Sequence, residues 1–241
     1  MTGPSAFTVL CCRPEPSMSP ADHTETVTDD PNVTAAIARI LAARGPNPVH
    51  YVGRRPGKKI DGLLTGRVLV VGDDADLAAV VLRLLRGELL GSVEIAYAPP
   101  RRTPATELWG LPHDAPAVKL AGTGEVDLVP LVRDDAGGVL VGAGHLGPVN
   151  GTVYVDEHRL LRGAAQRLRV EPDREKGLAV TVTRRRFLGI GRSRRTTLGR
   201  AVQIGTVATL VVLDGVAYPR PMERWTFYKH TEPLRVVRGL F

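Results

Sequence analysis

Cysteine is scarce in this sequence: only Cys11 and Cys12 are present, and they are adjacent. Neighbouring cysteines rarely reach disulfide geometry, so a disulfide framework is excluded and a reducing, cytoplasmic compartment is expected. No run of about 18 uncharged apolar residues occurs, which excludes a membrane-spanning helix. The short apolar run at 7–12 lacks a basic start and a small-residue cleavage site, so we do not expect a secretory signal.

Several catalytic and metal-binding signatures are also missing. The sequence contains no G-x-x-x-x-G-K-[ST] phosphate loop, no G-x-S-x-G nucleophile elbow and no C-x-x-C pair. Its six histidines have no spacing typical of metal ligands. These absences argue against a P-loop NTPase, a serine hydrolase of that type and a structural zinc site.

The positive charge is concentrated in the second half of the chain. The net charge is +7 at pH 7, and residues 151–241 carry about 18 Lys and Arg against about 8 Asp and Glu. An excess of this kind suggests contact with an anionic surface such as phospholipid, nucleic acid or polyphosphate. Nearly all of it is arginine, however, which equally fits the coding bias of a GC-rich genome, and both interpretations stay open.

The first half of the chain alternates strand and helix patterns, which predicts an α/β layer with a mostly parallel sheet. A stretch rich in Pro, Ser and Thr, ending near residue 30, reads as a loop. The expected elements are a strand at 6–12, a helix from Asp30-Pro31 to Gly45, strands at 48–53, 68–71 and 93–99, and a short helix from Thr103-Pro104 to near Gly110.

The turn GDDAD at 72–76 is the most informative feature of this half. A buried strand stops at Gly72, and Asp74 or Asp76 is expected to cap the helix that follows. Backbone N–H groups and the positive end of the helix dipole converge at such a turn, which suits phosphate. Three aspartates would repel a phosphate unless a metal lay between them, so a plain capped helix start is the alternative.

After about residue 125, short runs of strand-forming residues separated by Gly, Asp or Pro turns replace this pattern, with no convincing helix. They predict an antiparallel sandwich or barrel. The expected fold class is therefore α+β, with an N-terminal segment at 1–30, a three-layer α/β domain at 31–128 and an all-β domain at 129–241.

Two motifs in the second half allow more than one interpretation. GAGHLG at 142–147 matches G-x-G-x-x-G, but Pro148 and a strand follow it, so a glycine-rich strand is favoured over a dinucleotide site. A hairpin tip at 184–195 suits an anionic membrane interface, or is simply a solvated hairpin. Nucleic acid is disfavoured because aromatic platforms and a groove-sized helix are missing. The arginines of the expected lipid surface are Arg184, Arg185, Arg186, Arg192, Arg194 and Arg195.

Three segments, VVGDDADLAAVV, LWGLP and VVLDG, carry a likeness that extends over most of residues 48–241. In order and spacing they resemble the diacylglycerol kinase catalytic-domain family of bacterial lipid kinases, which have an NAD kinase-like fold. VVGDDADLAAVV lies where the family has a strand followed by GGDGTLNEVV, LWGLP where it has L-G-I-P, and VVLDG at the closing D-G-E strand. The resemblance implies a nucleotide-binding first domain, a final strand that returns to it, ATP and Mg²⁺ as cofactors, and a lipid hydroxyl as acceptor.

The same resemblance implies functional residues around an interdomain cleft. Catalytic candidates are Asp74 and Asp214, and the metal-linked acid is Glu175. The nucleotide contacts are Gly72, Asp73, Asp74, Ala75 and Gly215.

The departures from the family pattern point to lost activity. Asp73, Ala75 and Asp76 replace Gly, Gly and Thr, the P-x-G-T-x-N-D loop has become PPRRTPATE, Lys176 follows Glu175 in the acidic pair, and Val216 replaces the glutamate base. Phosphoryl transfer depends on positioning and charge neutralisation around the phosphates. Losing the base alone typically costs about 10²–10⁴-fold.

We therefore expect a weakly active or inactive lipid kinase-like protein that binds nucleotide or anionic lipid, in the cytoplasm and peripherally at the inner membrane face. Two alternatives stay open. One is an active ATP-dependent lipid kinase in which Asp76 and Glu175 stand in for the missing acids. The other is a non-catalytic regulatory partner of a lipid enzyme, which would co-purify with that enzyme and have no affinity for nucleotide.

Overall fold

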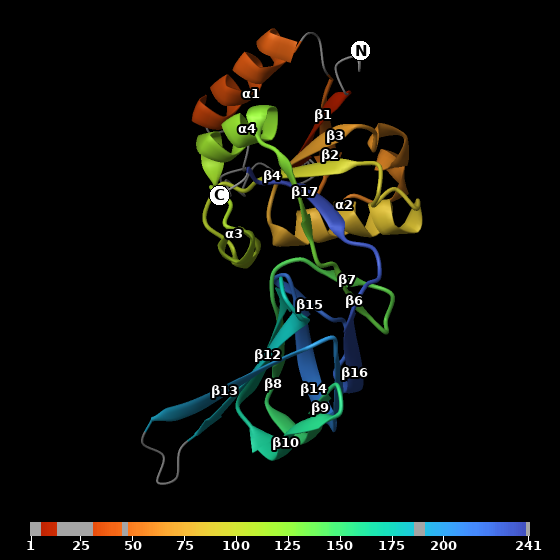
Figure 1. Ribbon diagram of the computed structural model, residues 1–241, viewed down its shortest axis with the longest axis vertical. Helices are drawn as coiled ribbons and strands as arrows, with labels where there is room; N and C mark the ends of the chain where they lie inside the picture. The colour runs from red at the N-terminus through yellow and green to blue at the C-terminus, as the bar shows by residue number, and fades with distance from the viewer. Residues whose placement is uncertain (1–5, 14–30, 45–47, 186–190, 240–241) are drawn as a thin grey trace, which may run out of the picture. The chain divides into compact units, whose positions relative to one another are not determined.

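The computed structural model describes residues 6–13, 31–44, 48–185 and 191–239. The chain divides into two compact units: unit 1 comprises Met1–Val129 and Pro233–Phe241, and unit 2 comprises Pro130–Glu232. Unit 1 combines helices with a mostly parallel sheet, and unit 2 is built from antiparallel strands (Figure 1). The α+β class expected from the sequence is confirmed.

Six strands form the sheet of unit 1 in the order β2-β1-β3-β4-β17-β5. The strands β1, β2, β3 and β4 run parallel, β17 is parallel to β4, and β5 is antiparallel to β17. Their bounds are β1 Phe7–Arg13, β2 Val49–Gly53, β3 Arg67–Val71, β4 Glu94–Ala98, β5 Val126–Val129 and β17 Leu234–Val237. The chain thus returns to its first sheet through β17.

Helices cover both faces of this sheet, which makes three layers (Figure 1). The helices α1 (Pro31–Arg44) and α4 (Asp114–Thr123) pack on one face, where they share a core with Leu69 and Val71 of β3. The helix α2 (Asp74–Arg86) lies on the other face and buries its apolar stripe there. A continuous β-branched strand such as β3 is what burial on both faces requires.

Two shorter elements complete unit 1: the 3-10 helix η1 (Lys58–Leu63) and the helix α3 (Pro104–Trp109). Thr103 caps α3 and Gly110 ends it, as the sequence predicts. By contrast, α4 was not expected, because Pro116 and Gly122 interrupt a segment with no clear apolar stripe. Across the described ranges, no helix has the length and apolarity needed to cross a bilayer.

Unit 2 is an antiparallel sheet that folds around one long strand, β14. The first part of β14 pairs with β9 and β16 and the last part with β8 and β15, with an irregularity between Gly205 and Thr209. Trp225 and Phe227 fill the core that results. The strands are β6 Val132–Asp134, β7 Val139–Leu140, β8 Gly144–Gly147, β9 Val149–Val155, β10 His158–Ala165, β11 Arg167–Asp173, β12 Gly177–Arg185, β13 Arg192–Gly199, β14 Ala201–Leu213, β15 Val216–Ala217 and β16 Met222–Lys229.

Candidate functional site

The turn at 72–76 connects β3 to α2, as expected, but its cap is Asp73 rather than Asp74 or Asp76. Asp73 has the extended backbone of an N-cap, and its carboxylate accepts a hydrogen bond from the Asp76 N–H at 3.0 Å. In return, the Asp76 carboxylate accepts the Asp73 N–H at 3.1 Å. This capping box occupies two of the N–H groups that a phosphate would use at a helix N-terminus.

The Asp76 carboxylate also fills the space above Gly72. A Cβ atom added to Gly72 would lie 2.6 Å from Asp76 Oδ2. Glycine in such a turn allows a ligand to approach the backbone closely. Here the Asp76 side chain of the same turn occupies that space. Asp76 is completely buried.

Arg54, directly after β2, supplies the charge that balances these acids. Its Nε lies 3.1 Å from Asp76 Oδ1 and 2.9 Å from Oδ2, and its Nη2 contacts the Asp73 carboxylate. The Arg55 N–H donates to Asp76 Oδ1 at 2.7 Å. Burial raises the pKa of the Asp76 carboxyl, whereas the hydrogen bond from Arg55 and the charge of Arg54 act in the opposite direction.

The sequence did not point to Arg54, although a signal was available. The parallel order β2-β1-β3 places the carboxyl ends of β2 and β3 at one edge of the sheet. A basic run after one strand, here Arg54 and Arg55, can therefore meet an acidic run after another. Arg54 therefore balances the charges of Asp73 and Asp76 within the turn.

Asp74 is buried and holds neighbouring elements together. Its Oδ1 accepts a hydrogen bond from Tyr97 Oη of β4 at 2.8 Å, and its Oδ2 accepts the Ala105 N–H at the start of α3 at 3.1 Å. Ala75, which follows it, is buried in the first turn of α2. Both oxygens of the candidate catalytic carboxylate are therefore in contact with protein donors.

This turn does not fit a magnesium ion. Mg²⁺ requires a near-octahedral set of oxygen ligands, and one or two of them are normally protein carboxylates. The oxygens of Asp74 and Asp76 already accept hydrogen bonds from protein groups. Within the part of the chain that the structure describes, no three His, Cys, Asp or Glu residues are placed to hold a metal.

In unit 2, Asp214 and Gly215 form the two-residue turn between β14 and β15. Their φ angles of 48° and 85° are those of an Asp-Gly hairpin turn. The buried Asp214 carboxylate accepts the N–H groups of Val141, Gly142 and Ala143 at 3.0, 2.8 and 3.0 Å. Asp214 thus holds the loop that leads into β8. The motif at 142–147 continues into strands, as the sequence predicts, and not into a helix.

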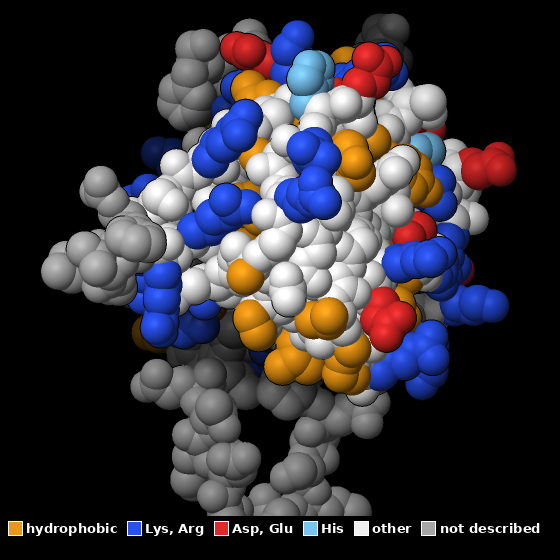
Figure 2. All heavy atoms as spheres, turned by 90° about the horizontal axis from the view of Figure 1, so that it is seen from below, with side chains coloured by type: hydrophobic (Ala, Val, Ile, Leu, Met, Phe, Trp, Pro, Cys, Tyr) orange, Lys and Arg blue, Asp and Glu red, His pale blue; other side chains and the backbone are white. Residues whose placement is uncertain are grey.

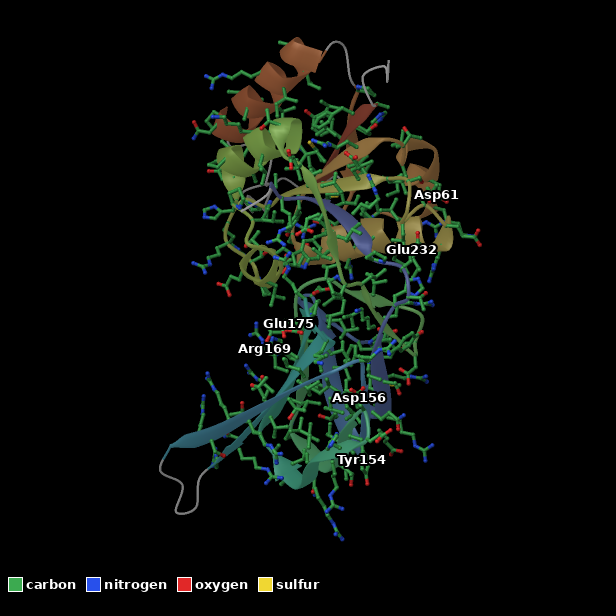
Figure 3. The ribbon with its side chains drawn as sticks, in the orientation of Figure 1. Asp61, Tyr154, Asp156, Arg169, Glu175 and Glu232 are labelled. Atoms are coloured by element: carbon green, nitrogen blue, oxygen red, sulfur yellow. The ribbon has the colours of Figure 1, made fainter. Side chains whose placement is uncertain are left out.

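Glu175 lies in the turn between β11 and β12 (Figure 3). The N–H groups of Glu175 and Lys176 donate to Asp173 Oδ1 at 3.1 and 2.8 Å, which orders the turn. In unit 2, as far as it is described, Glu175 belongs to no group of acids or histidines that could ligate a metal. The role of Glu175 as a metal ligand stays a prediction.

The arginines of the hairpin are divided between two faces of the sheet. Side chains alternate along a strand, and the register pairs Thr183 with Arg194 and Arg185 with Arg192 on one face. On the other face, Arg195 pairs with Val182, and Arg184 pairs with Ser193. Arg186 lies outside the described residues. The five described arginines therefore do not form the single surface expected from the sequence.

Comparison with known proteins identifies the fold. A diacylglycerol kinase from Bacillus anthracis str. Sterne matches with a TM-score of 0.69 and 14% identity, over 99% of this chain and 98% of that chain. A putative diacylglycerol kinase from the same organism matches with a TM-score of 0.71 and 14% identity, over 99% of both chains. An NAD kinase from Archaeoglobus fulgidus, solved in complex with ATP, matches with a TM-score of 0.55 and 13% identity, over 97% and 93%. No protein-family model and no curated protein matches the sequence.

Proposed function

We propose that this chain, which has the fold of bacterial diacylglycerol kinases, is a lipid kinase-like protein that transfers phosphate weakly or not at all. The observation that carries the proposal is the position of the Asp76 carboxylate. It fills the space above Gly72 and is held there by Arg54. A nucleotide phosphate would have to displace the Asp76 carboxylate and pair with Arg54 in its place.

The size of this obstacle follows from the cost of separating a buried ion pair. Removing one partner from such a pair costs about 3–5 kcal/mol, and every 1.4 kcal/mol is about tenfold in affinity. Because about a third of the Arg54 side chain is exposed, solvent screens part of this interaction and about 2 kcal/mol remains. Displacing Asp76 from Arg54 should therefore weaken ATP binding by about 10–10²-fold relative to an open turn. Repulsion between the phosphates and Asp73 adds to this.

A second obstacle concerns the acceptor. Val216, where the resembled family has its base, carries no group that accepts a proton. The neighbouring Asp214 carboxylate is engaged with three backbone N–H groups, so it is committed to the 141–143 loop.

The proposal also includes peripheral contact of the protein with anionic lipid in the cytoplasm. Figure 2 supports this contact, because Lys and Arg side chains clearly outnumber Asp and Glu on the face it shows.

The test is calorimetric titration of the whole chain with ATP, with and without Mg²⁺. We expect no detectable heat up to millimolar ATP for the wild type. Asp73→Gly combined with Asp76→Thr should bind ATP more tightly than the wild type, because it opens the space above Gly72 and frees Arg54. Thermal unfolding of the variant checks that it is folded.

The opposite result is equally clear. Micromolar, Mg²⁺-dependent binding by the wild type that is lost in Asp74→Ala would contradict the proposal and favour the active kinase. The matched control is Asp61→Ala in η1 (Figure 3), which removes an exposed carboxylate paired with Arg83. Transfer of labelled γ-phosphate to diacylglycerol in vesicles then measures activity directly.

A further inference from the structure

Unit 2 has a sheet face that is polar and basic, opposite the face that forms its core. The inward residues of β11 and β12, such as Leu168 and Val180, are buried in that core. The outward residues follow the register across the strands. One row runs Val212, His145, Arg169, Thr181, Thr196, and the next contains Arg167, Thr183 and Arg194.

This outward face of β11, β12 and β13 forms an open hollow of about 570 Å³, which we call the arginine hollow. Four arginines line it: Arg167, Arg169, Arg192 and Arg194. The three threonines of the two rows supply hydroxyl groups, and Thr181 and Thr196 hydrogen-bond each other at 2.8 Å. The volume is in the range of small-molecule sites.

The positive charge in the arginine hollow is mostly uncompensated. Its one acidic residue, Glu171, is paired with Arg169, whose Nη2 lies 2.6 Å from Oε1 (Figure 3 labels Arg169). None of the described side chains forms an ion pair with Arg167, Arg192 or Arg194. Four guanidinium groups against one carboxylate leave a surplus of three positive charges on one small concave face.

His145, in the first of the two rows, responds to this field. Burial lowers the pKa of its imidazole, the charges of Arg169 and Arg167 lower it further, and Glu171 acts in the opposite direction. Its neighbour on β14, Val212, carries no charge. His145 Nδ1 is buried and has no hydrogen-bond partner. The imidazole is therefore a reporter of any anion that enters the arginine hollow.

The geometry points to a site for a compound that carries at least two clustered phosphate groups. Guanidinium groups bind phosphate in a bidentate manner, and threonine hydroxyls add further donors. None of the described residues that line the hollow has an aromatic side chain on which a nucleobase would stack. The ligand is recognised through its phosphates alone, and all the residues involved belong to unit 2, so the inference holds whether or not phosphoryl transfer is lost.

Phosphates of this kind have two sources, a soluble polyphosphate or the headgroups of a lipid surface. The first probe is inorganic pyrophosphate, titrated calorimetrically against the whole chain. The second is a set of phosphatidylcholine vesicles with and without phosphatidic acid, tested by co-sedimentation. Binding of pyrophosphate assigns a soluble ligand, and binding only to vesicles that contain phosphatidic acid assigns a headgroup; either outcome supports the site.

Neighbouring arginines provide matched variants. Arg167→Ala with Arg194→Ala removes two charges from the arginine hollow, whereas Arg159→Ala with Arg162→Ala removes two exposed charges from β10 of the same unit, outside the hollow. We expect the first pair to weaken binding at least about tenfold, and the second by less than about twofold. Equal losses of affinity in the two double variants would overturn the inference. It would also be overturned if the wild type bound neither pyrophosphate nor vesicles that contain phosphatidic acid.

Proton NMR of His145, assigned with His145→Gln, gives a readout that needs no arginine variant. A bound anion offsets the field of Arg169 and Arg167, so the pKa of His145 should rise when the probe that binds is added. The proposal is wrong if a bound probe leaves this pKa unchanged.

Discussion

Replacing Arg54 with alanine tests whether the turn of unit 1 depends on its internal ion pair. The change leaves the buried Asp76 carboxylate without its cation, while the N–H groups of Asp73 and Arg55 still donate to it. Breaking a buried pair costs about 3–5 kcal/mol. Because about a third of the Arg54 side chain is exposed, solvent screens part of the interaction, and we expect a loss of about 2 kcal/mol.

The loss should depend on pH with a defined sign. Burial already raises the pKa of Asp76 above its ordinary value of 3.8, and removing Arg54 raises it further. A carboxyl with a raised pKa in the folded state binds its proton more tightly there than in the unfolded chain. The deficit of Arg54→Ala is therefore full at pH 7 and shrinks as the pH falls through the raised pKa of Asp76, because the protonated carboxyl no longer interacts with a cation.

The assay is urea unfolding of unit 1 at several pH values between neutral and about pH 4. A chain of two units need not unfold in one step, so the signal must come from unit 1. Trp109 in α3 supplies it when Trp225 of unit 2 is replaced by phenylalanine in every variant compared. Fluorescence then follows the unit that contains Asp76.

Arg55→Ala is the control for the loss of a positive charge at this place. Arg55 contacts Asp76 through its backbone N–H, and its side chain is exposed, so we expect a change of less than about 0.5 kcal/mol. The reasoning would be refuted if unit 1 of Arg54→Ala had the same free energy of unfolding as the wild type, or if its loss of stability did not change with pH.

Two further predictions concern other buried groups. Asp214→Ala should destabilise unit 2 by about 3 kcal/mol, because three buried N–H groups lose their acceptor. Urea unfolding followed through Trp225 measures this loss of stability. Asp214→Asn keeps an acceptor and should lose less stability, and equal losses for the two variants would contradict this account. Burial raises the pKa of the Cys11 thiol to about 11 and also raises that of Cys12. Iodoacetamide at pH 8 should therefore modify neither cysteine until urea unfolds unit 1. Rapid labelling of the native protein, detected by mass spectrometry, would show that the two thiols are accessible and contradict this prediction.

The sequence predicts elements well where one signal dominates. The run at 68–71 and the apolar spacing after it could belong only to a buried strand and an amphipathic helix, and both are present. The cap of α2 could not be chosen in the same way. Asp73, Asp74 and Asp76 have the same side chain, and the cap is the one whose backbone is extended.

The partners of the candidate residues were harder to predict, because they come from distant strands. Arg54 meets Asp76 only through the parallel order β2-β1-β3. Arg167 joins the row of Arg194 only through the register of β11 and β12, and a shift of one residue would place it on the opposite face. Composition predicted a basic second half of the chain but not which arginines share a surface.

The turn before α2 and the arginine hollow differ in what balances their positive charge. At the N-terminus of α2, the positive groups are Arg54 and the helix dipole, and Asp73 and Asp76 neutralise both from within the turn. In the arginine hollow, Arg169 alone has an acidic partner. A phosphate must therefore compete with fixed carboxylates in unit 1, whereas in unit 2 it meets guanidinium groups that have no described partner. If both tests succeed, this chain recognises phosphate on the outward β-sheet face of unit 2 and not at the turn before α2.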